Sequence, residues 1–270
     1  MSETETAAEG PEVTVERRDG IAILTLNRPR SANAQGMSWG RAMMAALDEV
    51  EDDDSVSAIL LSGAGKVFCA GGKMGETMNV EGVDMEVQFR AVRDCFRAVE
   101  RIREHELPVV CALNGAAIGG GAALAMACDL VIAAENASYA FPFGMLGASA
   151  VDMGCSYMLP RLVGTARAKQ IMLTSATVGA EQGKVDGLFL DVVPREKLFD
   201  AAFALARSIV GSGSRRALAG TKLALHRGET TEYSSVVAYE LYMQCYMLNT
   251  DEHKRRLKAF VDGRKGKPGA

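Results

Sequence analysis

A run of three glycines between a predicted strand and a predicted helix constrains this chain more than any other feature. Residues 108–113 are apolar, as in a buried strand, the glycines follow at 119–121, and the small apolar residues 122–128 favour a packed helix. Glycines at a helix entrance let another molecule approach the backbone, where the first N–H groups lack helical partners. These N–H groups can hold an anion or a developing oxyanion. The alternative is that these glycines only allow the strand and the helix to pack closely. Glycine runs often mark turns between elements without any binding role.

Composition narrows the class of protein. With 270 residues, 48% hydrophobic and 24% charged, the chain is long enough for one large domain or one domain with an appendage. A net charge of -4 gives no basic face for nucleic acid or an acidic membrane. No apolar run approaches membrane-spanning length, and residues 1–11 do not resemble a signal peptide, so we expect a cytoplasmic protein. The six cysteines lack Cys-x-x-Cys spacing, and several of them lie in apolar runs, as buried reduced thiols do.

Hydrophobic periodicity predicts an α/β fold in one domain. After a disordered leader (1–11), a hairpin is predicted around Asp19-Gly20, and then a helix that Ser38 caps. A long amphipathic helix precedes the glycine run, with an apolar face formed by Phe89, Val92, Phe96 and Val99. Short strands are predicted at 58–61, 108–113 and 130–133, and helices dominate after residue 164. We therefore predict a core at 12–205 and a helical C-terminal region at 206–270.

Four motifs carry a resemblance to a known family. They are Ile23-Leu24-Thr25-Leu26-Asn27-Arg28-Pro29, Phe68-Cys69-Ala70-Gly71-Gly72, Asn114-Gly115-Ala116-Ala117-Ile118-Gly119-Gly120-Gly121 with Cys128-Asp129-Leu130, and Leu159-Pro160-Arg161-Leu162-Val163-Gly164. In this order and spacing they resemble the enoyl-CoA hydratase/isomerase, or crotonase, family over residues 12–265. The resemblance implies a spiral of stacked β-turns with helices, an acyl-CoA substrate of the kind met in fatty acid metabolism, and no separate cofactor. It also implies homotrimers, or dimers of trimers, built through the C-terminal helices.

The resemblance also implies an oxyanion hole. Its two backbone N–H donors, one from each glycine turn, fall on Gly72 and Gly120. A thioester enolate places negative charge on one oxygen, and two fixed donors stabilise that charge without reorganising. The loss of one such donor typically costs about 3 kcal/mol.

Two positions depart from the family pattern. Family hydratases carry two glutamates that handle the water and the α-proton, and the matching positions here are Ala123 and Phe143. Neither side chain can move a proton. Hydration by two carboxylates is therefore in doubt, because each general acid or base typically contributes 10²–10⁴-fold.

One acid stands where some family isomerases place a proton-shuttling aspartate. This acid is Asp152, in an apolar, glycine-rich loop before the predicted helix 155–162. The alternative is a helix N-cap, a position that favours aspartate. We favour catalysis, with the pKa of Asp152 raised by burial beside Met145, Leu146 and Met153. Glu76 is a second acid that can assist, or can simply be exposed on a loop.

The remaining candidates concern binding. The resemblance also implies residues that bind CoA. They are Arg30, Ala70, Lys73, Met74, Phe260 and Lys265. The acyl pocket is expected to be lined by Ala123, Phe143, Met145 and Tyr157, although tyrosines are more often packing or subunit contacts. The three histidines are isolated in sequence, so no metal site is expected.

These features predict an enoyl-CoA isomerase with Asp152 as proton shuttle. An enoyl-CoA hydratase or dehydratase that uses Asp152 with a non-standard partner is the first alternative. The second is a non-catalytic subunit that binds acyl-CoA or an acyl-carrier protein, as the missing glutamates permit.

Overall fold

The computed structural model describes residues 10–78, 81–149 and 152–265. The chain divides into two compact units, Met1–Gly211 and Ser212–Ala270. The predicted boundary at 206 falls within a helix of the first unit, α7 (Leu198–Ser212), and the predicted leader lies mostly outside the described residues. No described helix is both long and apolar enough to cross a bilayer.

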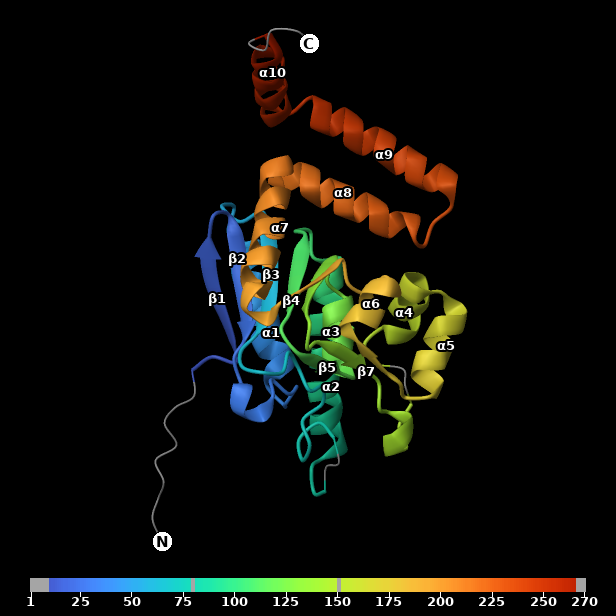
Figure 1. Cartoon of the computed structure of the whole chain (residues 1–270). Coiled ribbons are helices and arrows are strands. Elements are labelled where there is room, and N and C mark those ends of the chain that lie inside the picture. The colour runs from blue at the N-terminus through green and yellow to red at the C-terminus, as the bar shows by residue number, and fades with distance from the viewer. Residues whose placement is uncertain (1–9, 79–80, 150–151, 266–270) are drawn as a thin grey trace. The chain divides into compact units, whose positions relative to one another are not determined.

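A mixed six-stranded sheet organises the first unit within the described residues (Figure 1). Its strand order is β1-β2-β3-β4-β6-β9, in which only the β1–β2 pair is antiparallel. β1 and β2 form the predicted hairpin, with both turn residues, Asp19 and Gly20, in the left-handed region (φ 53° and 76°) that a tight two-residue turn requires. The strands are β1 (Val13–Arg18), β2 (Ile21–Leu26), β3 (Ala58–Gly63), β4 (Val109–Leu113), β6 (Leu130–Ala134) and β9 (Asp191–Val193).

The central strands are buried on both faces, as parallel strands covered by helices must be. β4 is buried at every residue, which its uninterrupted apolar sequence predicted. A second, three-stranded sheet has the order β5-β7-β8, from β5 (Ala116–Ile118), β7 (Ser138–Ala140) and β8 (Thr177–Gly179). β5 follows β4 directly and leads into the predicted helix, α3 (Gly120–Met126). The strand–glycine–helix order is confirmed.

Two long helices, α1 (Trp39–Glu51) and α2 (Met85–Glu104), pack against each other. On α1 the predicted face is correct, since Met43, Leu47 and Val50 are buried. Ser38 holds the N-cap position, but its hydroxyl donates to the Glu12 carboxylate rather than to the helix.

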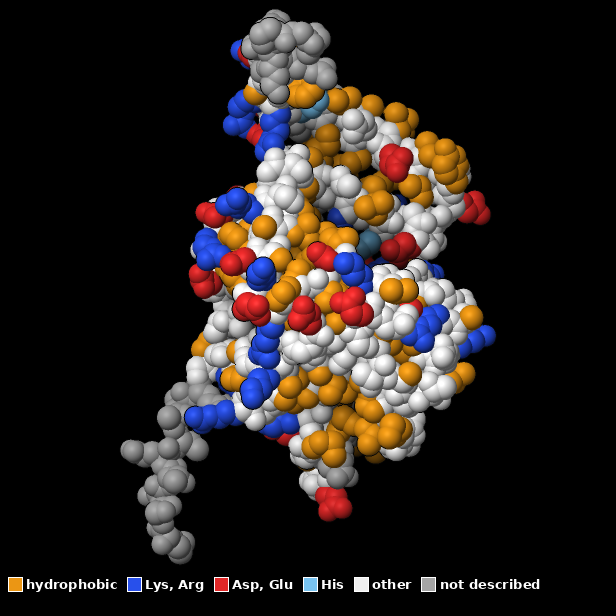
Figure 2. Space-filling view, viewed as in Figure 1, with side chains coloured by type: hydrophobic (Ala, Val, Ile, Leu, Met, Phe, Trp, Pro, Cys, Tyr) orange, Lys and Arg blue, Asp and Glu red, His pale blue; other side chains and the backbone are white. Residues whose placement is uncertain are grey.

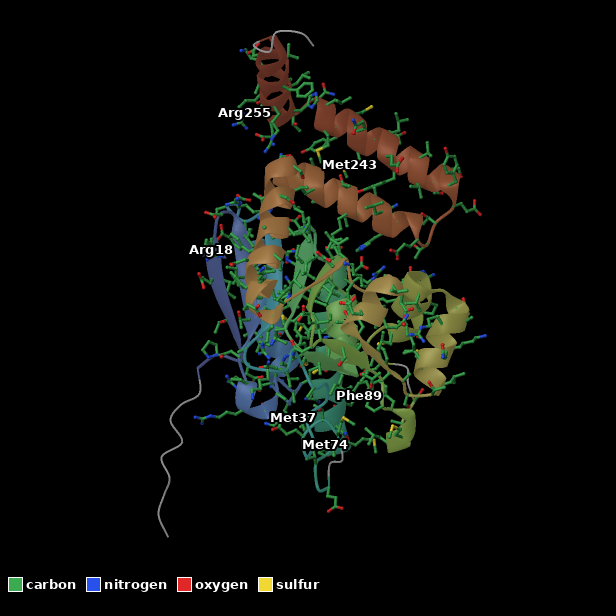
Figure 3. The ribbon with its side chains drawn as sticks, in the orientation of Figure 1. Arg18, Met37, Met74, Phe89, Met243 and Arg255 are labelled. Carbon is green, nitrogen blue, oxygen red and sulfur yellow. The ribbon has the colours of Figure 1, made fainter. Side chains whose placement is uncertain are left out.

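The predicted face of α2 is correct only in part. Val99 is buried as predicted, but Phe89 is 64% exposed and Phe96 is 41% exposed, and α2 instead buries small residues such as Ala91, Cys95 and Ala98. Apolar side chains gather on the surface at the end of the core where α2 begins (Figure 2). Figure 3 places Phe89 there, near Met74.

The close approach of α1 explains this choice of face. A Cβ at Gly40 would lie 2.3 Å from the carbonyl carbon of Asp94 and 2.5 Å from the amide nitrogen of Cys95, so α2 presents its smallest residues to α1. Bulky aromatic side chains do not fit between helices at this distance.

The other helices complete each unit. In the first unit they are η1 (Pro29–Ser31), η2 (Gly144–Leu146), α4 (Cys155–Val163), α5 (Thr165–Leu173), α6 (Ala180–Val185), η3 (Arg195–Lys197) and α7. The second unit consists of α8 (Arg215–Gly228), α9 (Tyr233–Leu248) and α10 (Asp251–Lys265), which confirms its predicted helical character.

Gly40→Ala tests the contact between α1 and α2. The added methyl meets rigid backbone, so we expect the free energy of unfolding to fall by about 1–3 kcal/mol in urea denaturation. Gly211→Ala on α7 is the matched control, because its added Cβ meets nothing within 4 Å. That variant should be neutral or more stable by up to about 1 kcal/mol. Equal unfolding free energies for the two variants would contradict the close approach.

Candidate functional site

Two glycine turns from distant parts of the chain meet at the candidate site. The first, residues 69–73, lies beside β5, where the Ile118 N–H donates to the Cys69 carbonyl at 2.9 Å. A Cβ at Gly71 would lie 2.5 Å from the Ile118 carbonyl oxygen, and one at Gly121 would lie 2.2 Å from the Cys69 carbonyl oxygen. The turns therefore touch through backbone atoms, which only glycine allows.

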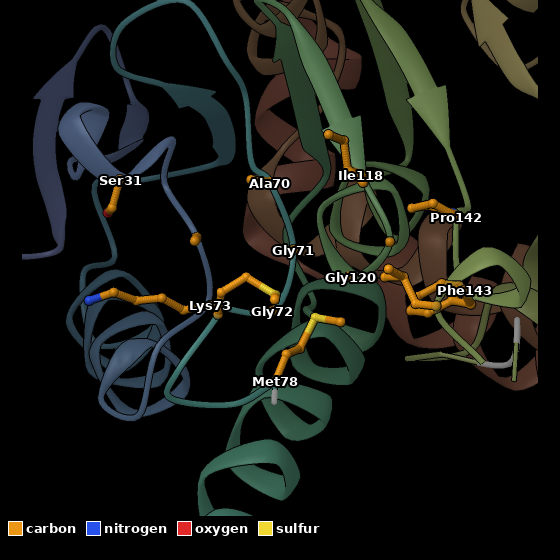
Figure 4. Close-up of a pocket in the computed structure, with 14 residues that line it drawn as sticks. Ser31, Ala70, Gly71, Gly72, Lys73, Met78, Ile118, Gly120, Pro142 and Phe143 are labelled. Atoms are coloured by element: carbon orange, nitrogen blue, oxygen red, sulfur yellow. The ribbon is translucent and has the colours of Figure 1, made fainter. Parts of the chain in front are cut away.

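The N–H groups of Gly72 and Gly120 are available to a ligand. Neither donates to a protein acceptor among the described residues, and Gly120 is the first residue of α3, where an N–H has no helical partner. Gly119, just before it, has φ 53°, which turns the chain from β5 into the helix. Both donors line one cavity of about 380 Å³ (Figure 4).

The wall of this cavity is mostly apolar. Of the predicted site residues, Ala70, Lys73, Met74 and Phe143 line it together with the two donor glycines; its other described lining residues are Ser31, Ala34, Gly71, Met78, Ile118, Gly119, Pro142 and Leu146. The amine of Lys73 points away from the two donors in Figure 4. An apolar wall excludes water and strengthens hydrogen bonds to a developing charge.

Met78 is a lining residue that the sequence did not indicate. Its side chain lies beside Gly72, with Cγ 2.7 Å from the position a Cβ would take there. The loop is held by Thr77, whose hydroxyl accepts the Lys73 N–H at 2.8 Å and donates to the Gln35 carbonyl at 2.7 Å. No periodicity marks such a contact, because loop conformation alone brings Met78 back to the turn.

Asp152 is a half-buried acid whose carboxyl has no hydrogen-bond partner among the described residues, although its backbone carbonyl accepts the Cys155 N–H at 2.8 Å. Burial raises the pKa of its carboxyl from 3.8 to about 6. Its charge helps raise the pKa values of the Cys95 thiol on α2 and the Cys155 thiol on α4, so the carboxyl lies near both thiols. The next residue, Met153, reaches the second turn, with its methyl 3.1 Å from the Cβ position of Gly120.

The helix-cap alternative for Asp152 is wrong. The N-cap of α4 is Gly154, and no side chain caps that helix. The carboxyl therefore accepts no capping hydrogen bond at the start of α4, which fits the raised pKa. The expected neighbours differ in part: Met153 is half-buried, whereas Met145 is 78% exposed and Leu146 is 57% exposed.

Glu76 is tied to the first turn. Its carboxylate pairs with the Lys73 ammonium at 2.5 Å and accepts the Met37 N–H at 3.0 Å, and these bonds hold its pKa below the usual range. An acid with a lowered pKa is a weak base, so the geometry favours a structural role. Lys73 thus anchors the loop through Glu76.

The other predicted residues, Asp152 and Glu76 included, are not among the described lining of the cavity. Arg30 is exposed on η1, Met145 is exposed on η2, and Ala123 is buried inside α3. Tyr157 lies under the guanidinium of Arg161, 3.5 Å from the ring centroid. Phe260 is exposed on α10 in the second unit, and the side chain of Lys265 lies outside the described residues. The binding roles of these residues stay predictions.

Metal ligands are not clustered in the described part of the chain. No group of three or more His, Cys, Asp or Glu there is arranged to hold a metal ion. All six cysteines are free thiols, and burial raises the pKa of Cys69 to about 12.

Comparisons with known proteins agree on one family. The family model "Enoyl-CoA hydratase/isomerase" matches residues 16–268. A short-chain-enoyl-CoA hydratase of Clostridium acetobutylicum is 34% identical, covering 94% of this chain and 95% of its own. A 1,2-epoxyphenylacetyl-CoA isomerase of Escherichia coli is 32% identical, with 90% and 92% covered. The crystal structure of an enoyl-CoA hydratase from Bacillus anthracis superposes with a TM-score of 0.87 at 29% identity, over 93% of this chain and 96% of that chain. The chain therefore belongs to the enoyl-CoA hydratase/isomerase family and has the crotonase fold that its motifs predicted.

Proposed function

We propose that this protein is an enoyl-CoA isomerase that moves a double bond along an acyl-CoA thioester by means of a single acid, Asp152. One observation carries the proposal: the Asp152 carboxyl is desolvated, accepts no hydrogen bond from the described residues, and is adjacent to Met153, whose methyl lies beside Gly120 of the second glycine turn. A carboxyl with a pKa of about 6 can both take and return a proton near neutral pH.

The reaction needs one proton transferred twice. The Asp152 carboxylate abstracts an activated C–H proton, and the electron pair moves through the conjugated chain onto the thioester oxygen. The N–H groups of Gly72 and Gly120 hold the resulting dienolate oxygen. The protonated Asp152 then delivers the same proton to another carbon, which restores the thioester carbonyl and shifts the double bond. No water and no second acid enter this sequence.

The missing glutamates argue against hydration. Ala123 and Phe143 occupy the two positions where family hydratases hold acids, and neither can activate water. A relative from Escherichia coli, 32% identical, is named a 1,2-epoxyphenylacetyl-CoA isomerase, which supports an isomerase rather than a hydratase. A hydratase or dehydratase and a non-catalytic acyl-CoA or acyl-carrier-protein subunit are distinct outcomes of the experiments below.

Asp152→Asn tests the proton shuttle. The amide keeps the shape of the side chain but cannot accept the proton, so turnover should fall by about 10²–10⁴-fold. The matched control is Asp84→Asn, because Asp84 is a true helix cap that accepts the N–H groups of Glu86 and Val87. Asparagine also caps well, so this control should keep wild-type turnover. Full activity of Asp152→Asn would refute the mechanism.

Mass spectrometry of products from an acyl-CoA panel in D2O tests the reaction type. Isomerisation should yield products of unchanged composition, with deuterium incorporated where the acid exchanges with solvent before it returns the proton. Addition of the elements of water would identify a hydratase and contradict the proposal. Absence of any turnover across the panel, with binding retained, would identify a non-catalytic subunit.

The raised pKa of Asp152 predicts two pH profiles. Because the base must be ionised, kcat/KM should rise about tenfold per pH unit below the pKa of about 6 and level off above it. Stability has the opposite sign, since the folded pKa exceeds 3.8 and ionisation of the folded state is disfavoured. The Tm of Asp152→Asn should therefore equal that of wild type below pH 3.8 and exceed it increasingly up to about pH 6. A constant Tm difference across this range would contradict the desolvated carboxyl.

A further inference from the structure

Gln35 is a fully buried amide at the junction of the two glycine turns. Its side chain is 0% exposed, although the preceding residue, Ala34, lines the cavity. It stands between η1 and α1, outside both glycine motifs. Neither the proposed proton transfer nor the expected CoA contacts use it.

The backbone of Gln35 holds the first turn on both sides of Gly72. Its N–H donates to the Gly71 carbonyl at 2.7 Å, and its carbonyl accepts the Lys73 N–H at 3.1 Å. Gly72 is therefore paired with Gln35 in a parallel bridge, and its own N–H stays free. The direction of this N–H is fixed by the residue that flanks it.

The side chain of Gln35 reaches the second turn. Its Nε2 donates to the Gly120 carbonyl at 3.2 Å, across 85 positions of sequence. The opposite amide orientation would set Oε1 against that carbonyl, so two acceptors would face each other. A Cβ on Gly120 would lie 2.2 Å from Oε1, so glycine at this position is what admits the amide.

A contribution to stability does not explain why glutamine occupies position 35. Its Oε1 is buried and has no hydrogen-bond partner among the described residues, a state that typically costs about 1–3 kcal/mol. The Gly120 carbonyl belongs to the first turn of α3, whose backbone ladder supplies a donor of its own. An apolar residue of similar shape would be neutral or stabilising at position 35.

We propose that Gln35 is a positioning residue that fixes the two oxyanion donors relative to each other, with its backbone on the Gly72 turn and its side chain on the Gly120 turn. This inference rests on the proposed function, because the two N–H groups need a common alignment only if they hold one oxygen. Preorganised donors stabilise an oxyanion without reorganisation, and a displacement of about 1 Å can cost 10²-fold in rate.

The experiment compares Gln35→Met and Gln35→Leu with wild type. Acetoacetyl-CoA is the probe, because its enolate absorbs in the near ultraviolet and mimics the dienolate that the hole would hold. We expect wild type to raise the enolate fraction of the bound probe, and each variant to lower the enolate-to-keto ratio and kcat by about tenfold, less than the loss of a whole donor. The Kd of free CoA and the Tm should stay at wild-type values or, for Tm, rise. Gln35 is not among the described residues that line the cavity.

Asn114→Ala is the control for a purely structural amide. Asn114 is a buried amide satisfied at both ends, since it donates to the Gly65 carbonyl at 3.0 Å and accepts the Gly63 N–H at 3.2 Å. Its loss should lower the Tm and leave the enolate ratio of the bound probe near that of wild type.

The possible results distinguish a failure of the Gln35 inference from a failure of the proposed function. If wild type stabilises the enolate and both Gln35 variants do so equally well, Gln35 does not position the donors. The same conclusion follows if both variants lose Tm in the way that Asn114→Ala does, with the enolate ratio unchanged. If wild type itself leaves the probe in its keto form, the oxyanion hole is refuted and the inference with it.

Discussion

Backbone contact between two glycine turns is the constraint on which the site depends. Gly71 and Gly121 lie so close to opposing carbonyls that any Cβ would collide, and this closeness brings both free N–H groups to one cavity. The parallel sheet makes the contact possible, because β3 and β4 end at the same edge and each leads into one turn. The segments that complete the core of the fold therefore also supply the two N–H donors of the candidate site.

Desolvation acts on both halves of the proposed chemistry. The apolar wall around Gly72 and Gly120 strengthens hydrogen bonds to a developing oxyanion, because water does not compete for them. Burial without hydrogen bonds from described residues also raises the pKa of Asp152 to about 6. The same removal of water thus makes the donors more effective and gives the acid a pKa suited to a reversible proton transfer.

The sequence predicted the features that depend on neighbouring residues alone. The Asp19-Gly20 hairpin, the buried strands and the entrance to α3 follow from turn chemistry and apolar runs, and the structure confirms them. The exposure of Phe89 and Phe96 was not predictable in this way, because the buried face of α2 depends on tertiary contacts such as the approach of α1 to Asp94 and Cys95 at Gly40. Gln35 carries no local signal for the same reason: the carbonyl that gives its side chain a role lies 85 positions away.

The position of Phe143 indicates that access of water, more than the number of acids, decides between hydration and double-bond isomerisation in this chain. Its ring lies against the second turn, with Cζ 2.9 Å from the Cβ position of Gly119, and it lines the cavity beside the proposed oxyanion site. A hydratase must hold a water molecule near its acids, so it needs polar side chains where this chain has a ring and, at Ala123, a buried methyl. In the proposed reaction, Asp152 is the proton source for the dienolate. Return of that proton to the acyl chain is then favoured over the addition of water.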